Sequence, residues 1–141
     1  MSLSIIILAA GKGTRMRSDL PKVLHTLGGR PLLWHALATA RRFADARIHV
    51  VIGHHAERVR DTFRDAYIDW IEQSELLGTG HAVAQVMPVL PDGEPVLIMY
   101  GDIRVIGYDT LAPLCSIASL GFVGVLTAEP EDPTGYGRIL H

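Results

Sequence analysis

The sequence is short of several features whose absence narrows its function. It has a single cysteine, Cys115, so no disulfide can form within the chain. A membrane-spanning helix needs about 18 consecutive apolar residues, and no apolar stretch in this sequence is that long. The apolar start, Leu3 to Leu8, passes directly into a glycine-containing loop with no cleavage site between them. We therefore expect a cytoplasmic protein with no membrane partner.

The sequence also lacks an excess of charge of either sign. Thirteen basic and fifteen acidic residues give the 141-residue chain a formal net charge of -2. This balance gives no electrostatic reason to expect a nucleic-acid partner. Hydrophobic residues make up 48% of the chain, and it shows no repeat or low-complexity tract, so one globular domain is expected.

Short apolar runs alternate along the chain with longer segments of helical periodicity. The predicted strands are residues 3–8, 48–53, 68–73, 95–102 and 122–128, and the predicted helices are residues 31–43, 56–66, 81–89 and 109–120. Continuous apolar strands that alternate with helices indicate a parallel sheet covered on both faces. We therefore expect an α/β fold, Rossmann-like, with a mostly parallel sheet.

In such sheets, ligands bind beyond the carboxyl ends of the strands, so the residues that follow each strand are candidate site residues. These residues are Gly11 to Met16, Gly53 to His55, Gln73 to Thr79, and Gly101 with Asp102. Glycines allow a ligand to approach the backbone closely, and Asp102 adds a carboxylate. Together these loops predict one polar crevice.

The first loop, LAAGKGTRMRSDLPK (residues 8–22), has three interpretations. A dinucleotide fingerprint needs a third glycine where Met16 stands, and a P-loop needs a different spacing around Lys12. The third interpretation is a loop whose backbone N–H groups, with Arg15 and a downstream lysine, surround a nucleotide triphosphate. The chain has only two lysines, Lys12 and Lys22, and both lie in this segment, which favours the third interpretation.

Each of these features also has a purely structural interpretation. Asp102 could cap or turn the chain, and the segment GTGH could simply open the helix that contains His81. His54, His55 and Glu57 resemble metal ligands, but no cysteine or further histidine stands at ligand spacing with them. We therefore expect no zinc site.

Four motifs, in order along the chain, resemble those of the sugar-nucleotide pyrophosphorylases. They are LAAGKGTRMRSDLPKVLH (8–25), EQSELLGTGHAVAQ (72–85), MYGDIRVI (99–106) and EDPTGYGRI (131–139). They are most similar to the uridylyltransferase domain of the bacterial bifunctional N-acetylglucosamine-1-phosphate uridylyltransferase/glucosamine-1-phosphate acetyltransferases. The resemblance implies that UTP and N-acetylglucosamine 1-phosphate react to give UDP-N-acetylglucosamine and pyrophosphate, with Mg²⁺ as cofactor.

The resemblance also implies roles for individual residues. Arg15 and Lys22 would be catalytic, neutralising charge on the α-phosphate and the departing pyrophosphate, and Asp102 would bind Mg²⁺. Lys12 is expected to point into solvent. Substrate contacts would come from Leu8, Ala9, Ala10, Gly11, Lys22, Gln73, Gly78, Thr79, Tyr100, Gly101, Asp102 and Gly137. One departure is Arg104, which stands where the family usually has a proline and adds a charge near the phosphates.

The end of the chain, YGRILH, is an apolar run that reads as the start of a strand near Ile139. It predicts that residues 1–141 are the N-terminal part of a single nucleotidyltransferase domain. The resemblance implies that the rest of this domain, with a second metal ligand, lies outside the chain. It implies the same for a left-handed β-helix acetyltransferase domain that would make the parent a homotrimer. Two alternatives remain: a non-catalytic nucleotide-binding or scaffold module of the same fold, and a pyrophosphorylase for another sugar phosphate.

Overall fold

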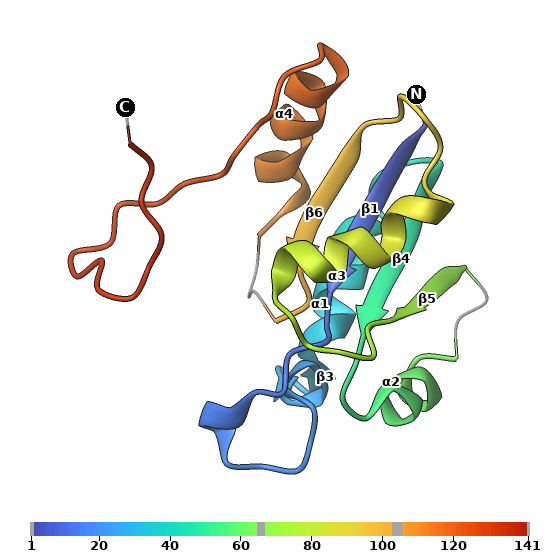
Figure 1. The fold of residues 1–141 in the computed structure, drawn as a ribbon, viewed down its shortest axis with the longest axis vertical. Coiled ribbons are helices and arrows are strands. Elements are labelled where there is room, and N and C mark those ends of the chain that lie inside the picture. Colours follow the sequence, from blue (N-terminus) through green and yellow to red (C-terminus); the bar gives the residue numbers. More distant parts are fainter. Residues whose placement is uncertain (1, 65–66, 103–105, 141) are drawn as a thin grey trace.

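The computed structural model describes residues 2–64, 67–102 and 106–140, and its central element is a four-stranded parallel sheet (Figure 1). The strands are β1 (Leu3–Leu8), β4 (Ala46–Ile52), β5 (Ile68–Glu72) and β6 (Val96–Tyr100), in the spatial order β5-β4-β1-β6. β1 pairs with β4 on one side and β6 on the other, and all six of its residues are buried. A strand covered on both faces needs no polar alternation, which explains why β1 is apolar except for Ser4, whose hydroxyl donates a hydrogen bond to Glu94.

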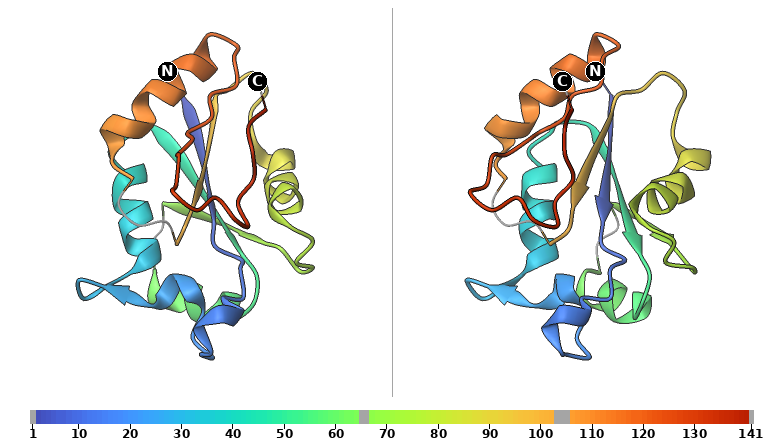
Figure 2. Two further views of the ribbon diagram at one scale, coloured as in Figure 1. Left: turned by 90° about the vertical axis from the view of Figure 1, so that its left-hand side faces the viewer. Right: turned by 60° about the vertical axis from the view of Figure 1, so that its left-hand side comes forward.

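Helices cover both faces of this sheet, which confirms the α/β fold expected from the sequence. In the left-hand view of Figure 2, α1 (Leu32–Ala40) and α4 (Tyr108–Ser119) lie on one side of the sheet and α3 (Thr79–Val86) on the other. The short helix α2 (Ala56–Thr62) adds Val59 to the core on the α1 side. Within the described ranges, no helix is both long enough and apolar enough to cross a bilayer.

The predicted strands and helices up to residue 120 are found, with boundaries that differ by a few residues. The helix predicted over 31–43 is α1, which starts one residue later because Pro31 closes a small antiparallel ribbon, β2 (Thr26–Leu27) with β3 (Arg30–Pro31). Three 3₁₀ helices were not predicted: η1 (Thr14–Met16), η2 (Lys22–Leu24) and η3 (Met87–Val89). Pro113 does not interrupt α4. The expectation for Arg104 lies outside the described residues.

The predictions for the C-terminal segment were wrong: neither a strand over 122–128 nor one starting near Ile139 is formed. Phe122 and Val123 are exposed by 67% and 89%, and an apolar cavity of about 620 Å³ is lined by residues 121–126, α4 and β6. A strand requires a hydrogen-bonded neighbour, and within the described residues this segment has none. β6 is therefore an open edge of the sheet.

A buried histidine on β4 links stability to pH. The ring of His49 is 2% exposed, and neither nitrogen has a hydrogen-bond partner among the described residues; the nearest Asp69 oxygen is 3.4 Å from Nδ1. Burial is the largest effect and lowers the pKa of His49; the nearby Asp69 raises it, Arg47 lowers it and Glu94 raises it, and the net result is a lowered pKa. Because the folded-state pKa lies below the ordinary value of 6.5, the unfolded chain binds the proton more readily.

We therefore predict that stability is retained above about pH 6.5 and falls as the pH drops below that value. His49→Leu should flatten this part of the profile, because the group that takes up the proton on unfolding is removed. Urea midpoints of the wild type and the variant at pH ~7.5 and ~5.5 test the prediction. His54→Gln changes an exposed histidine and should leave the wild-type pH dependence intact. An unchanged slope in His49→Leu would contradict the assignment.

Candidate functional site

Three loops, which follow β1, β5 and β6, meet at the carboxyl ends of the strands and surround a cavity of about 410 Å³. The fourth predicted loop, Gly53 to His55 after β4, does not line this cavity. Backbone hydrogen bonds hold the starts of these loops to the sheet. The N–H groups of Ala9, Gln73 and Gly101 each donate at 2.8 Å, to the carbonyls of Val51, Ile52 and Leu8 respectively. The strands thus fix the first residues of three loops against one another, which keeps the floor of the cavity rigid.

Glycines in these loops stand where a side chain would not fit. Gly13 has φ +59°, a left-handed conformation that favours glycine, and a Cβ there would lie 2.7 Å from the Cβ of Lys22. A Cβ on Gly101 would lie 3.2 Å from the carbonyl oxygen of Leu8 and 3.3 Å from the Cβ of Ala9. The first glycine lets the loop pass directly over Lys22, and the second lets β6 end tightly against the β1 loop.

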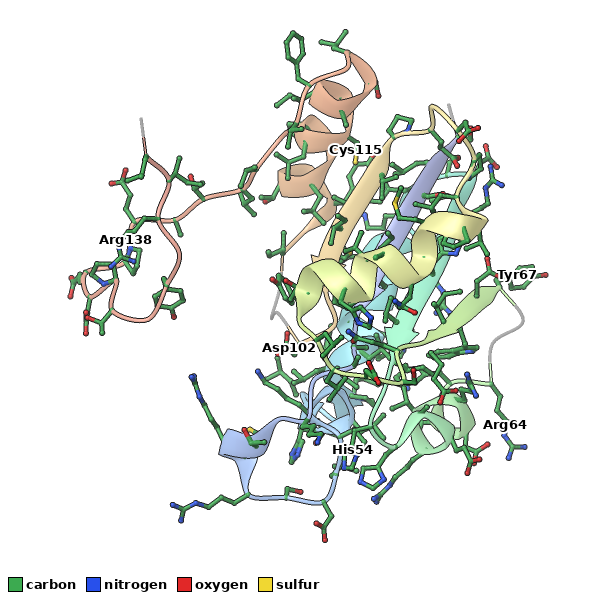
Figure 3. The ribbon with its side chains drawn as sticks, in the orientation of Figure 1. His54, Arg64, Tyr67, Asp102, Cys115 and Arg138 are labelled. Carbon is green, nitrogen blue, oxygen red and sulfur yellow. The ribbon has the colours of Figure 1, made fainter. Side chains whose placement is uncertain are left out.

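Lys22 and Asp102 form an ion pair at the cavity, with Nζ and Oδ2 2.5 Å apart. The backbone of Lys22 is anchored because the next two residues, Val23 and Leu24, are buried in the core. Its side chain remains 42% exposed and that of Asp102 25% exposed, so the pair is open to solvent and to a ligand. Figure 3 shows Asp102 just beyond the end of β6. A partly exposed ion pair adds little to stability, which leaves both charges available for binding.

A hydrogen-bonded group of side chains forms the part of the site between β5 and α3. Gln73 is 3% exposed, and its amide nitrogen lies 3.2 Å from the carbonyl oxygen of Gly78 and 2.8 Å from Nδ1 of His81. The amide nitrogen of Gln85 lies 3.2 Å from the other ring nitrogen of His81. These contacts tie the loop after β5 to the first turns of α3.

The structure brings most of the sequence-predicted site residues together. Those that line the 410 Å³ cavity are Leu8, Ala9, Ala10, Gly11, Lys22, Gln73, Gly78, Thr79, Tyr100 and Asp102. Gly101 is buried beside Asp102 and shapes the cavity from beneath. Arg15 is exposed on η1 and does not line the cavity.

Gly137 is not brought to the site, contrary to expectation. It lies in an exposed C-terminal segment, and Figure 3 shows its neighbour Arg138 far from Asp102. The motif EDPTGYGRI was placed at the cavity by resemblance alone, and within the described residues this segment pairs with no strand that would hold it there.

Sequence reasoning also missed several residues that line the cavity. Lys12 is exposed, as expected, but it lines the cavity together with Lys22. Leu76 and Ala82 contribute apolar surface, and only their position near the GTG segment could have pointed to them. His81 is not among the predicted site residues, because its contact with Gln73 depends on how β5 and α3 pack.

The α/β fold is similar to that of several solved structures. The protein Rv0371c of Mycobacterium tuberculosis H37Rv superposes with a TM-score of 0.73 at 19% identity, over 84% of this chain and 61% of that one. The 4-diphosphocytidyl-2C-methyl-D-erythritol synthase of Anaerococcus prevotii DSM 20548 gives 0.63 at 21% identity, over 83% and 50%. HddC of Yersinia pseudotuberculosis gives 0.62 at 26% identity, over 70% and 47%.

A family model for the MobA-like NTP transferase domain matches residues 5–136, and the chain therefore belongs to this family. The matched region includes all three loops around the cavity. The chain spans about half to three-fifths of the length of the three structures compared above.

Proposed function

We propose that this protein transfers a nucleotidyl group from a nucleoside triphosphate to a sugar phosphate, with UTP and N-acetylglucosamine 1-phosphate as the substrate pair. The observation that carries the proposal is the 410 Å³ cavity in which a glycine-containing backbone loop, Lys22 and Asp102 meet. Membership of the MobA-like NTP transferase family supports nucleotidyl transfer. The choice of uracil and of N-acetylglucosamine rests on the four sequence motifs.

In the proposed reaction, an oxygen of the sugar phosphate attacks the α-phosphorus of UTP. A new P–O bond forms as the bond to the β-phosphate breaks, and pyrophosphate leaves with the electron pair. Because the attacking and leaving groups are both phosphate oxygens, no general base is needed, and the protein's task is positioning and charge stabilisation. Backbone N–H groups near Gly11 would bind phosphate oxygens, and Lys22 would balance the charge that develops on pyrophosphate.

A divalent cation, with Mg²⁺ as the proposed ion, fits the residues present. Asp102 supplies a partly exposed carboxylate at the cavity, and no group of three or more His, Cys, Asp or Glu side chains among the described residues forms a metal cage. Mg²⁺ is commonly held by one or two carboxylates together with substrate phosphates, so Asp102 would share the ion with the nucleotide. The bound ion would neutralise phosphate charge. Among the structures similar to this one, Rv0371c has been solved with manganese.

The remaining contacts are assigned by their place around the cavity. We propose that Gln73, Gly78 and Thr79 bind the base, and that Tyr100 borders the ribose and the sugar. Arg15, on η1, would contact the departing pyrophosphate. Because Arg15 does not line the cavity, we expect it to contribute less to catalysis than Lys22 does. HddC has been solved with GMP-PN, so related folds accept different bases, and specificity has to be measured for this chain.

The test is a calorimetric titration of the protein with UTP, CTP, GTP, ATP and dTTP, each with Mg²⁺. We expect saturable binding with UTP preferred, and a loss of affinity in a variant that fills the loop, Gly13→Val, since its side chain would displace Lys22. A folded protein that binds none of these nucleotides would contradict the proposal. Binding with no pyrophosphate release from the full-length enzyme, whichever sugar phosphate is supplied, would favour a non-catalytic nucleotide-binding module.

We further propose that residues 1–141 are the N-terminal part of the nucleotidyltransferase domain. The open edge of β6 and the shorter length of the chain relative to the compared structures support this division. The 141-residue chain should then bind UTP without forming UDP-N-acetylglucosamine. It should also self-associate more readily than the full-length enzyme, because an unpaired edge strand can pair with another chain.

A further inference from the structure

The amide of Gln73 is held in one orientation by its surroundings. Its nitrogen lies 3.2 Å from the carbonyl oxygen of Gly78, and a carbonyl can only accept a hydrogen bond. Turning the amide over would place two oxygens against each other, so the nitrogen must face Gly78. The second N–H donates to Nδ1 of His81, at 2.8 Å. Both donors of the amide are therefore used within the protein.

The amide oxygen of Gln73 is left for a ligand. No described residue donates a hydrogen bond to it, and Gln73 lines the cavity. Oε1 can only accept, so a base that contacts it must present an N–H group. Uracil at N3 and guanine at N1 carry a hydrogen on the ring nitrogen, whereas cytosine at N3 and adenine at N1 carry a lone pair.

His81 is the residue that completes this arrangement. Nδ1 must be unprotonated to accept from Gln73, so a neutral ring carries its proton on Nε2. A neutral imidazole accepts at one nitrogen only, and the 2.8 Å contact with Gln73 is shorter than the 3.2 Å contact with Gln85. The amide nitrogen of Gln85 donates instead to the carbonyl oxygen of His81, at 3.3 Å, so its approach to Nε2 is not needed to hold Gln73.

We propose that His81 is a positioning residue for base selection, which orients the amide of Gln73 so that a lone acceptor faces a base with a ring N–H. This inference rests on the proposed function, because it places the nucleotide base beside Gln73. It assigns the preference for UTP over CTP to a hydrogen bond between two protein side chains. Without His81, only the longer contact to Gly78 favours this orientation of the amide, so its oxygen is held less firmly toward the base.

Nucleotide affinities of His81 variants test this inference. We expect His81→Leu to lower the ratio of UTP to CTP affinity by about tenfold. In the wild type, uracil can donate a hydrogen bond to the fixed acceptor and cytosine cannot, so the preference is worth about one hydrogen bond. His81→Asn keeps an acceptor near Gln73 and should restore much of the wild-type ratio. 3-Methyl-UTP, which lacks the ring N–H, should bind the wild-type protein poorly and lose little further affinity in His81→Leu.

Gln85→Ala is the matched control, because it removes the other contact of the same ring and leaves the Gln73 contact in place. Its UTP-to-CTP ratio should equal that of the wild type. If His81→Leu weakens UTP and CTP equally, the inference is overturned while the proposed function stands. If the folded wild-type protein prefers CTP, the inference and the choice of UTP both fail, while nucleotidyl transfer stands. If the wild type binds no nucleotide, the proposed function itself fails.

Discussion

Replacing Asp102 with asparagine is expected to lower turnover of the proposed longer enzyme at least about a hundredfold, because losing the proposed metal ligand would remove stabilisation of charge in the transition state. Asp102 is the residue to test because it brings a carboxylate to the cavity next to Lys22. Asparagine has nearly the same shape, so the floor of the cavity should be unchanged. The measurement is pyrophosphate release at saturating Mg²⁺, UTP and sugar phosphate.

Nucleotide binding by the 141-residue chain provides a second readout. UTP affinity should rise when Mg²⁺ is added to the wild type, and this increase should be much smaller in Asp102→Asn. Without Mg²⁺ the variant should bind UTP at least as well as the wild type, because a negative charge has been removed near the phosphates. Glu94→Gln, at the opposite end of β6, is a control carboxylate that should leave the Mg²⁺ effect intact. Turnover of Asp102→Asn equal to that of the wild type would rule out the metal assignment.

The parallel sheet could be predicted because its signal is local. Five of the six residues of β1 are apolar, and each following strand of the sheet is separated from the next by a helical pattern, so order and type follow from periodicity alone. The strand expected over 122–128 has the same apolar composition but is not formed. Composition gives the tendency to form a strand, whereas pairing depends on a neighbour that the local sequence does not specify.

The candidate site was predictable where it follows directly from a strand end. Asp102 and Gln73 could be placed because parallel strands end at the same edge of the sheet. The contact between Gln73 and His81 could not be placed, because it depends on the packing of α3 against β5. For Gly137 the resemblance predicted a role in the site, but nothing in the described structure positions this residue near the cavity.

Replacing Lys22 with alanine should reduce kcat by about a hundredfold while weakening nucleotide binding only a few-fold. The reason is that the negative charge facing Lys22 grows as pyrophosphate departs, so the interaction is stronger in the transition state than in the bound substrate. The anchored position of Lys22, between the Gly13 loop and Asp102, fixes its ammonium group before the nucleotide binds. Separate measurement of kcat and of the nucleotide Kd tests the prediction.

The matched control is Lys12→Ala, since Lys12 also lines the cavity but is exposed on the loop and has no ion-pair partner among the described residues. It should lower kcat by less than Lys22→Ala and should mainly weaken binding. Arg15→Ala, on η1 beyond the cavity lining, should lie between the two if its side chain meets pyrophosphate. If Lys12→Ala lowers kcat more than Lys22→Ala does, the positive charge that stabilises the departing pyrophosphate is that of Lys12 and not that of Lys22.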